Sequence, residues 1–183
     1  MTTLVGIAGS LRKNSWNAML LRAAVKLAPP DVTTEIGSIR GIPLYDGDDE
    51  VATGIPSSAA VLKDLIARAD GLLLVTPEYN NSIPGVFKNA IDWLSRPPAD
   101  IQRVFGGKKV ALMGATIGGG GTLLAQAAWL PVLRTLGTSP WFGAKLHVSN
   151  VNKLFDESGE LTDEKLRSQL QAFLAGFAKF AAG

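Results

Sequence analysis

Two polar loops carry the residues whose types and spacing suit ligand chemistry. The first loop reads Gly9-Ser10-Leu11-Arg12-Lys13-Asn14-Ser15-Trp16-Asn17, and the second reads Pro77-Glu78-Tyr79-Asn80-Asn81-Ser82-Ile83-Pro84-Gly85. Each follows a short apolar run, 4–8 or 72–75, that is typical of a buried strand. Ligands bind at the carboxyl ends of the strands in an open α/β sheet, so we expect both loops to belong to one site.

The first loop predicts a phosphate site. Ser10, Ser15 and Asn17 offer neutral donors, and the guanidinium of Arg12 is a charged fork that matches phosphate geometry. A helix that begins near Ser15 would direct free N–H groups at the same point. The alternative is that Ser15 or Asn14 only caps this helix, and that Arg12 is a solvated surface residue.

The second loop predicts a site for a flat heterocycle. Pro77 and Pro84 stiffen its two ends. Between them, the backbone N–H and C=O groups of Glu78, Tyr79 and Asn80 can pair with the edge of a ring, and the Tyr79 side chain can lie along its face. The alternative is a plain connection from strand to helix that Pro84 starts, which accounts for the prolines but not for the polar residues between them.

A third loop follows the next predicted strand, 109–113. It reads Ala115-Thr116-Ile117 and continues into the glycine run 118–121. Glycine allows a close approach of the backbone to a ligand, or a positive φ. This loop can therefore line the other side of the ring or leave space for a second substrate, and a flexible turn stays open as an alternative for Gly120 and Gly121.

Strand and helix patterns alternate along the chain, and parallel strands need such crossover connections. Expected strands cover 4–8, 32–36, 72–75, 109–113 and 141–148. The strand 32–36 alternates apolar and polar residues, as an edge strand does. We therefore predict one α/β domain over residues 1–183, a flavodoxin-like three-layer sandwich with a five-stranded parallel sheet in the order 2-1-3-4-5. Strands 1 and 3 then flank the crevice where ligands bind.

Several local features complete this expectation. The glycine-rich and aspartate-rich segment 41–54 reads as loop. Pro131 falls inside a helical stretch and predicts a kink or two short helices. Thr162 is the expected N-cap of the last helix, with Leu161 and Leu166 as a hydrophobic staple. Trp129 and Trp141 belong either to the core or to a subunit contact, where aromatic residues are enriched.

Composition and motifs exclude several classes of protein. The chain has no cysteine, which removes disulfide and thiol chemistry, and its single histidine, His147, argues against a zinc site and a serine hydrolase. The first strand is not followed by the glycine pattern of a dinucleotide-binding domain. A net charge of +2 without basic runs predicts no binding to nucleic acid. No apolar segment is long enough to cross a membrane and no leader pattern is present, so we expect a cytoplasmic protein without membrane contact.

These motifs together resemble the NADPH-dependent FMN reductase family, which includes azoreductases, quinone reductases and chromate reductases. The similarity rests on the first loop from Gly9 to Asn17, on the second loop, and on the segment Lys88-Asn89-Ala90-Ile91-Asp92-Trp93. The resemblance implies that the first loop surrounds the FMN phosphate and ribityl chain, that the second borders the isoalloxazine, and that the third lies near its other edge. The residues implied as cofactor-binding are Gly9, Ser10, Arg12, Ser15, Trp16, Asn17, Pro77, Glu78, Tyr79, Asn80, Ser82, Thr116 and Gly118.

The resemblance also implies an enzyme and its reaction. NADPH, or NADH, would pass hydride to FMN, and a small acceptor such as a quinone, azo compound, metal oxyanion or free flavin would then be reduced. The flavin carries this chemistry, so no catalytic side chain is expected. A homodimer or homotetramer is implied as well. Two other functions stay open: a flavodoxin-type one-electron carrier, and a non-catalytic α/β module that binds another phosphorylated ligand.

Overall fold

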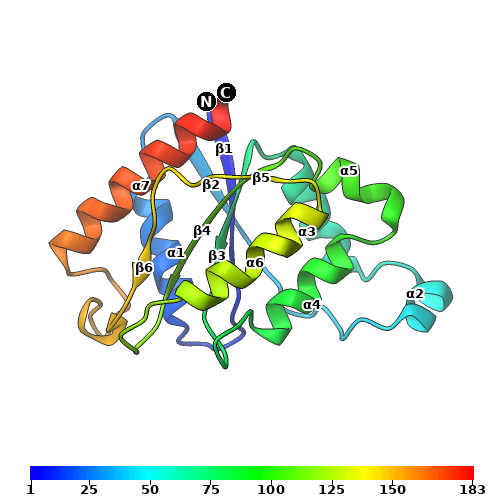
Figure 1. Cartoon of the computed structure of the whole chain (residues 1–183), viewed down its shortest axis with the longest axis horizontal. Helices are drawn as coiled ribbons and strands as arrows, with labels where there is room; N and C mark the ends of the chain where they lie inside the picture. The colour runs from blue at the N-terminus through cyan, green and yellow to red at the C-terminus, as the bar shows by residue number, and fades with distance from the viewer.

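A parallel sheet organises the computed structural model, which describes residues 1–183 (Figure 1). The hydrogen-bonded order is β2-β1-β3-β4-β5, and β6 pairs with the carboxyl end of β4. This order confirms the flavodoxin-like sheet that the alternation of strands and helices predicted. The strands are β1 (Thr2–Ala8), β2 (Val32–Gly37), β3 (Gly71–Val75), β4 (Lys109–Ala115), β5 (Ser139–Pro140) and β6 (His147–Val148).

Helices cover both faces of the sheet. α1 and α7 lie side by side on one face, at the left in Figure 1, and α3, α4 and α6 lie on the other. α2 stands apart from the sheet at the far right. The helices are α1 (Trp16–Leu27), α2 (Gly47–Thr53), α3 (Ser57–Arg68), α4 (Gly85–Leu94), α5 (Ile101–Val104), α6 (Leu123–Thr135) and α7 (Glu164–Ala182), with short 3₁₀ turns η1 (Pro98–Asp100) and η2 (Val151–Lys153).

Two hydrophobic clusters fill the space between the layers. Successive side chains of a strand point to opposite faces, so β3 contributes to both clusters. Leu72 and Leu74 pack under α3, α4 and α6, whereas Leu73 and Val75 pack under α1 and α7. All four side chains are completely buried, each contributing about 1.5–3 kcal/mol to folding. This burial on both faces explains why the strand is a continuous apolar run.

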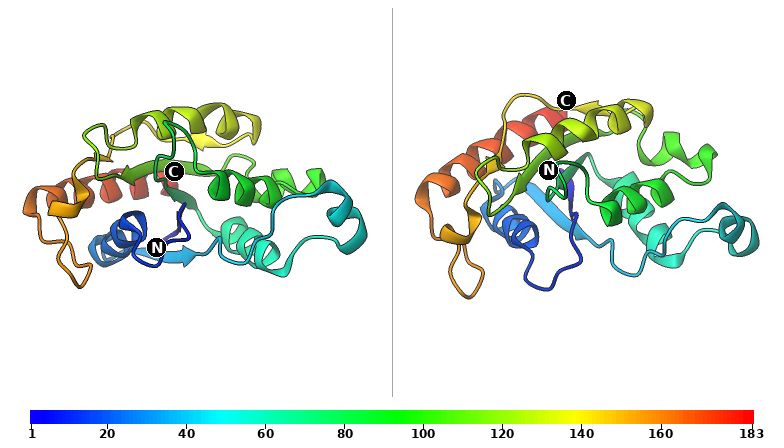
Figure 2. Two further views of the ribbon diagram at one scale, coloured as in Figure 1. Left: turned by 90° about the horizontal axis from the view of Figure 1, so that it is seen from below. Right: turned by 60° about the horizontal axis from the view of Figure 1, so that its bottom comes forward.

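The carboxyl ends of β1, β3 and β4 lie next to one another. Ala8 is opposite Val75, and Val75 is opposite Met113. Just beyond these pairs, the N–H of Gly9 donates to Val75 O at 2.9 Å, and the N–H of Thr76 donates to Met113 O at 2.8 Å. The three loops therefore leave the sheet side by side, at the bottom of Figure 1, and the right-hand view of Figure 2 brings this edge forward.

The predicted fifth strand, 141–148, is wrong in its bounds. β5 ends just before this segment. Only the last two residues of the segment, His147 and Val148, form a strand with β4, as β6. The chain leaves the sheet in between because the Trp141 ring packs on α7, with centroids 5.0 Å from Phe173 and 5.8 Å from Phe177. Gly143 lies against this ring, where a Cβ would come within 2.5 Å of the indole nitrogen. Packing against α7 thus outweighs continuous pairing along β4.

One expectation about the middle of the chain is also wrong, and one of two alternatives is excluded. The segment 41–54 contains α2, whose N-cap Asp46 accepts a hydrogen bond from the N–H of Asp48 at 2.8 Å. Acidic residues in the first turn of α2 favour the helix through its dipole. α6 runs unbroken from Leu123 to Thr135 with Pro131 inside it, which excludes two short helices, while a kink at Pro131 stays a prediction.

The last helix begins one residue later than predicted. Asp163 is its N-cap and accepts a hydrogen bond from the N–H of Leu166 at 2.7 Å. The hydroxyl of Thr162 instead donates to Leu154 O at 3.2 Å. A carboxylate at this point also gains from the helix dipole, which favours Asp163 over the neutral hydroxyl. Leu161 and Leu166 are both buried, but they do not occupy the staple positions once the cap moves.

Candidate cofactor site

The N-terminus of α1 borders a cleft at the carboxyl edge of the sheet. Ser15 is its N-cap, and its Oγ accepts a hydrogen bond from the N–H of Ala18 at 3.2 Å. The hydroxyl proton of Ser15 stays free, and the N–H groups of Trp16 and Asn17 have no acceptor within the helix. Together with the positive end of the helix dipole, these groups form a donor set that suits a phosphate.

Asn17 has a side-chain role that the sequence did not predict. Its side chain is buried, and its Nδ2 donates to Ala115 O while its Oδ1 accepts from the Ala115 N–H, each at 2.9 Å. The carboxamide therefore pairs with the end of β4 as a neighbouring peptide group would. Its oxygen and one amide hydrogen are committed to this pair. The side chain fastens the first loop to the third, and is not the free donor that was expected.

A tight turn shapes the second loop. The N–H of Tyr79 donates to Ser82 O at 3.1 Å, and the N–H of Ser82 donates to Tyr79 O at 3.0 Å. The two central residues, Asn80 and Asn81, have φ of 50° and 60°, as a type I′ turn requires, and asparagine tolerates this region better than most residues. The backbone groups of Tyr79 are therefore already paired and are not open to a ring edge, whereas Glu78 makes no backbone–backbone hydrogen bond.

Side-chain contacts link the three loops. The hydroxyls of Ser10 and Tyr79 lie 3.3 Å apart, which connects the first loop to the second. The carboxylate of Glu78 accepts a hydrogen bond from the N–H of Ala125, at the start of α6, at 2.9 Å. Since Asn17 joins the first loop to the end of β4, each loop is tied to another.

The loops enclose a cleft of about 210 Å³. Most of its wall consists of residues that the sequence predicted as cofactor-binding, and they come from all three loops. Ala115 and Ile117 also line the cleft and were not predicted, although they flank Thr116. The lining residues are Ser10, Arg12, Ser15, Trp16, Asn17, Pro77, Glu78, Tyr79, Ala115, Thr116 and Ile117.

Four predicted residues lie outside this wall: Gly9, Asn80, Ser82 and Gly118. Gly9 is buried in the fold, and a Cβ there would lie 2.1 Å from the Phe87 ring, so its small size serves packing against α4. Asn80 and Ser82 belong to the exposed turn. Gly118 is exposed beside Thr116, whose Oγ1 accepts its N–H at 3.3 Å.

The charges around the cleft are arranged for an anion. Arg12 is exposed and forms no ion pair, so its guanidinium is available to a ligand. Its own N–H donates to Ser10 Oγ at 3.3 Å, and Arg40 Nη2 donates to Leu11 O at 2.7 Å, which supports the loop from the side of β2. Glu78 is the one acidic side chain in the wall.

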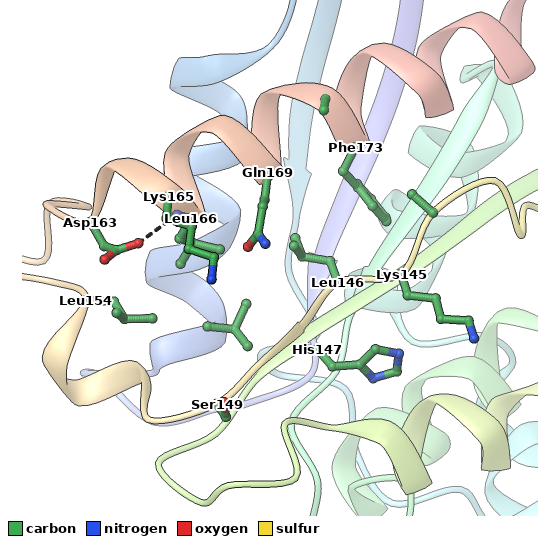
Figure 3. Close-up of a pocket in the computed structure, with 13 residues that line it drawn as sticks. Lys145, Leu146, His147, Ser149, Leu154, Asp163, Lys165, Leu166, Gln169 and Phe173 are labelled. Atoms are coloured by element: carbon green, nitrogen blue, oxygen red, sulfur yellow. Dashed lines mark hydrogen bonds between the residues drawn. The ribbon is translucent and has the colours of Figure 1, made fainter.

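A larger groove of about 620 Å³ lies between α7 and the segment 144–149 (Figure 3). None of the predicted site residues lines it. Its charged group at the start of α7, Asp163, is engaged as the helix cap, and the figure shows Gln169 directed toward the strand segment. The His147 ring is turned away from α7. Lys145 and Lys165 also line this groove, but it contains no arginine, and the N-terminus of α7 beside it is already capped by Asp163.

The remaining aromatic and titratable residues that the sequence singled out lie in the core or pack against other parts of the fold. Trp129 is completely buried in the core, and Trp141 packs on α7. Burial lowers the pKa of His147, and the charge of Lys145 lowers it further, which favours the neutral imidazole.

No cluster of three or more His, Asp or Glu side chains could hold a metal ion. None of the helices combines the length and apolar character that crossing a membrane requires.

Comparisons with known proteins identify the family of the chain. The chain matches the NADPH-dependent FMN reductase family over residues 2–153. It is 42% identical to an NAD(P)H-dependent FMN reductase of Pseudomonas aeruginosa, over 92% of this chain and 89% of the relative. It is 40% identical to a 2-hydroxy-1,4-benzoquinone reductase of a Burkholderia species, over 94% of this chain and 92% of the relative.

A solved structure is similar over the whole chain. FerB, a flavoenzyme NAD(P)H:(acceptor) oxidoreductase from Paracoccus denitrificans, shares 35% identity and a TM-score of 0.88, covering 100% of this chain and 98% of its own. The family match spans most of the sequence and the relatives exceed 30% identity. The chain therefore belongs to the NADPH-dependent FMN reductase family, and it is an oxidoreductase that uses FMN with NAD(P)H as electron donor.

Proposed function

We propose that this enzyme holds FMN in the cleft between the three loops and reduces small quinones at the expense of NAD(P)H. The observation that supports this most directly is the set of groups that line the cleft. The unpaired Arg12, the hydroxyl of Ser15 and the open N-terminus of α1 suit a phosphate. Pro77, Tyr79 and Thr116 supply walls for a flat polar ring, and Glu78 supplies backbone groups that no other backbone group occupies.

The shape of the cleft suits chemistry on an open ring face. At about 210 Å³ it is smaller than the roughly 300–1,000 Å³ of pockets that enclose a drug-sized ligand. Ile117 and Tyr79 at its rim are 64% and 43% exposed. One side of a bound flavin is then covered by protein, and the other stays accessible to the nicotinamide and to the acceptor in turn. Bound FMN supplies the electron-transfer chemistry, and the loops bind and orient it.

The acceptor class follows from the relatives. One is named as a 2-hydroxy-1,4-benzoquinone reductase and another, from Escherichia coli, as a quinone reductase. An open cleft without a catalytic acid or base suits planar acceptors that need only contact with the ring. We therefore rank quinones above azo compounds, metal oxyanions and free flavin as substrates, and a direct comparison of turnover among these acceptors tests the ranking.

A one-electron carrier of flavodoxin type would share the fold and FMN. Such carriers usually have an acidic surface and pass electrons to protein partners, whereas this chain has Arg12 and Lys13 in the first loop and a net charge of +2. The two functions separate in one assay. An oxidoreductase oxidises NADPH or NADH continuously when a quinone is supplied, and a carrier does not.

The testing experiment starts from purified protein. Its absorption spectrum should show bound FMN, or the apoprotein should gain thermal stability when FMN is added, because a ligand that binds only the folded state raises Tm. Steady-state oxidation of NADPH and of NADH with a quinone then gives the donor preference. Protein that neither binds FMN nor turns over either donor would refute the proposed function.

We also propose that the enzyme is a homodimer or homotetramer in which α6 is covered by a second subunit. Leu123, Leu124 and Leu130 of this helix are 54%, 48% and 37% exposed, and Arg134 is its one charged residue. A solvated helix normally presents a polar outer face. Light scattering should give twice or four times the chain mass, and Leu130→Asp should reduce it.

We place the enzyme in the cytoplasm, and cell fractionation tests that location.

A further inference from the structure

The start of α6 is capped by a residue from another loop. Thr122 is its N-cap by position, but its side chain makes no capping bond, and its Oγ1 accepts from Gln126 Nε2 at 3.0 Å. The N–H of Ala125, in the first turn, donates instead to the Glu78 carboxylate at 2.9 Å. The acceptor that normally comes from the N-cap residue therefore comes from the loop after β3.

Glu78 contacts both the start of α6 and the cofactor cleft. Its side chain caps α6, and the residue also lines the cofactor cleft between Pro77 and Tyr79. α6 has a second link to this loop, because Trp129 Nε1 donates to Thr76 Oγ1 at 3.1 Å in the core. This deeper link does not involve Glu78, so loss of the Glu78 contact frees only the first turn of the helix and the loop before it.

The glycine run before α6 has few side-chain contacts. A Cβ built on Gly119 or Gly120 meets no atom within 4 Å, and on Gly118 it meets only Thr116 Oγ1, at 3.9 Å. Backbone hydrogen bonds hold the start of this loop, because the N–H of Thr116 donates to Val148 O at 2.9 Å and the N–H of Asn150 donates to Gly118 O at 3.3 Å. The cap from Glu78 holds its other end, where the loop enters α6.

We infer that Glu78 is a positioning residue for the bound flavin. Its carboxylate fastens the second loop to the point where the third loop enters α6, and as the one acidic residue of the cleft wall it places negative charge beside the ring site. Reduction adds electrons to the ring, so a fixed negative charge nearby disfavours the reduced form and lowers the reduction potential. This inference rests on the proposed binding of FMN in the cleft.

Two variants separate the two effects. Glu78→Gln keeps an oxygen acceptor for the Ala125 N–H and removes the charge, whereas Glu78→Ala removes both. Glu157→Gln, on an exposed glutamate that makes no side-chain hydrogen bond or ion pair and lies outside the cleft wall, is the matched control. The readouts are the reduction potential of bound FMN by equilibration with a reference dye, FMN affinity by fluorescence quenching, and Tm of the apoprotein.

We expect the potential to shift in the positive direction in both Glu78 variants and to stay unchanged in the control. FMN affinity should fall about tenfold in Glu78→Ala, as expected for the loss of a cap worth about 1.4 kcal/mol, and by much less in Glu78→Gln. The apoprotein Tm should follow the same order. An unchanged potential in Glu78→Gln would refute the charge effect, and wild-type affinity in Glu78→Ala would refute the positioning role. Wild-type protein without FMN would instead refute the proposed function itself.

Discussion

Replacing Asn17 with leucine should destabilise the protein far more than its position in a predicted ligand loop suggests. Leucine has the same number and branching of side-chain heavy atoms but cannot hydrogen-bond, so Asn17→Leu leaves the N–H and the C=O of Ala115 without their 2.9 Å partners. Asn17 is only 3% exposed and Ala115 also 3%, so water reaches neither group easily. The substitution thus breaks two buried hydrogen bonds with one change.

The expected magnitude follows from these two bonds. Each buried backbone group left unpaired costs about 1–3 kcal/mol, so the pair predicts a loss of about 2–6 kcal/mol in the free energy of unfolding. That loss is a large part of the roughly 5–15 kcal/mol that a typical domain possesses. Urea denaturation of the apoprotein, followed by tryptophan fluorescence, measures it without any contribution from cofactor.

The matched control is Asn14→Leu, three positions earlier. Asn14 is exposed and its side chain makes no hydrogen bond, so the same chemical change there should alter stability by less than about 0.5 kcal/mol. If Asn17→Leu unfolded at the same urea concentration as Asn14→Leu, the link between the first and third loops would contribute nothing, and the structural role assigned to Asn17 would be wrong.

Further predictions concern the cofactor, a helix cap and acid stability. Arg12→Ala should weaken FMN binding about 10- to 100-fold in a fluorescence titration, because a charge-assisted hydrogen bond contributes about 1.5–3 kcal/mol, and should leave apoprotein Tm unchanged. Asp163→Ala should cost about 0.5–2 kcal/mol in urea, and Thr162→Ala should cost clearly less. The hydrogen bond from Arg96 lowers the pKa of Glu50 in the folded protein. The ionised Glu50 therefore stabilises the fold near neutral pH, and this stabilisation is lost as pH falls through the lowered pKa. The stability difference between wild type and Glu50→Gln should therefore shrink from about pH 5 toward pH 3.

The sequence was sufficient for features that depend on local pattern. The run Leu72–Val75 predicted a buried strand, and alternation in 32–36 predicted the edge strand, and both agree with the observed sheet order. Ser15 was predictable as a helix cap because serine at that position has a direct physical reason. The acidic stretch after Asp46 also carried a helix signal, a capping residue followed by acids, that the loop prediction overlooked.

Features that depend on distant partners were not predictable. Asn17 meets Ala115 across 98 positions, and Glu78 meets Ala125 across 47, so no local pattern reveals either contact. The bounds of the fifth strand failed for the same reason, because the Trp141 ring packs on a helix that the chain reaches more than twenty residues later. The sequence therefore indicated which loops line one cleft, and only the fold shows how side chains hold them together.

The central claim is that the first two loops and the start of the third bind one FMN molecule. A crystal structure of the protein soaked with FMN tests it most directly. The account predicts the phosphate at Arg12, Ser15 and the N-terminus of α1, and the ring between Pro77–Tyr79 and Thr116. FMN located in the larger groove beside α7, or a crystal in which the cleft holds no FMN at saturating concentration, would contradict it.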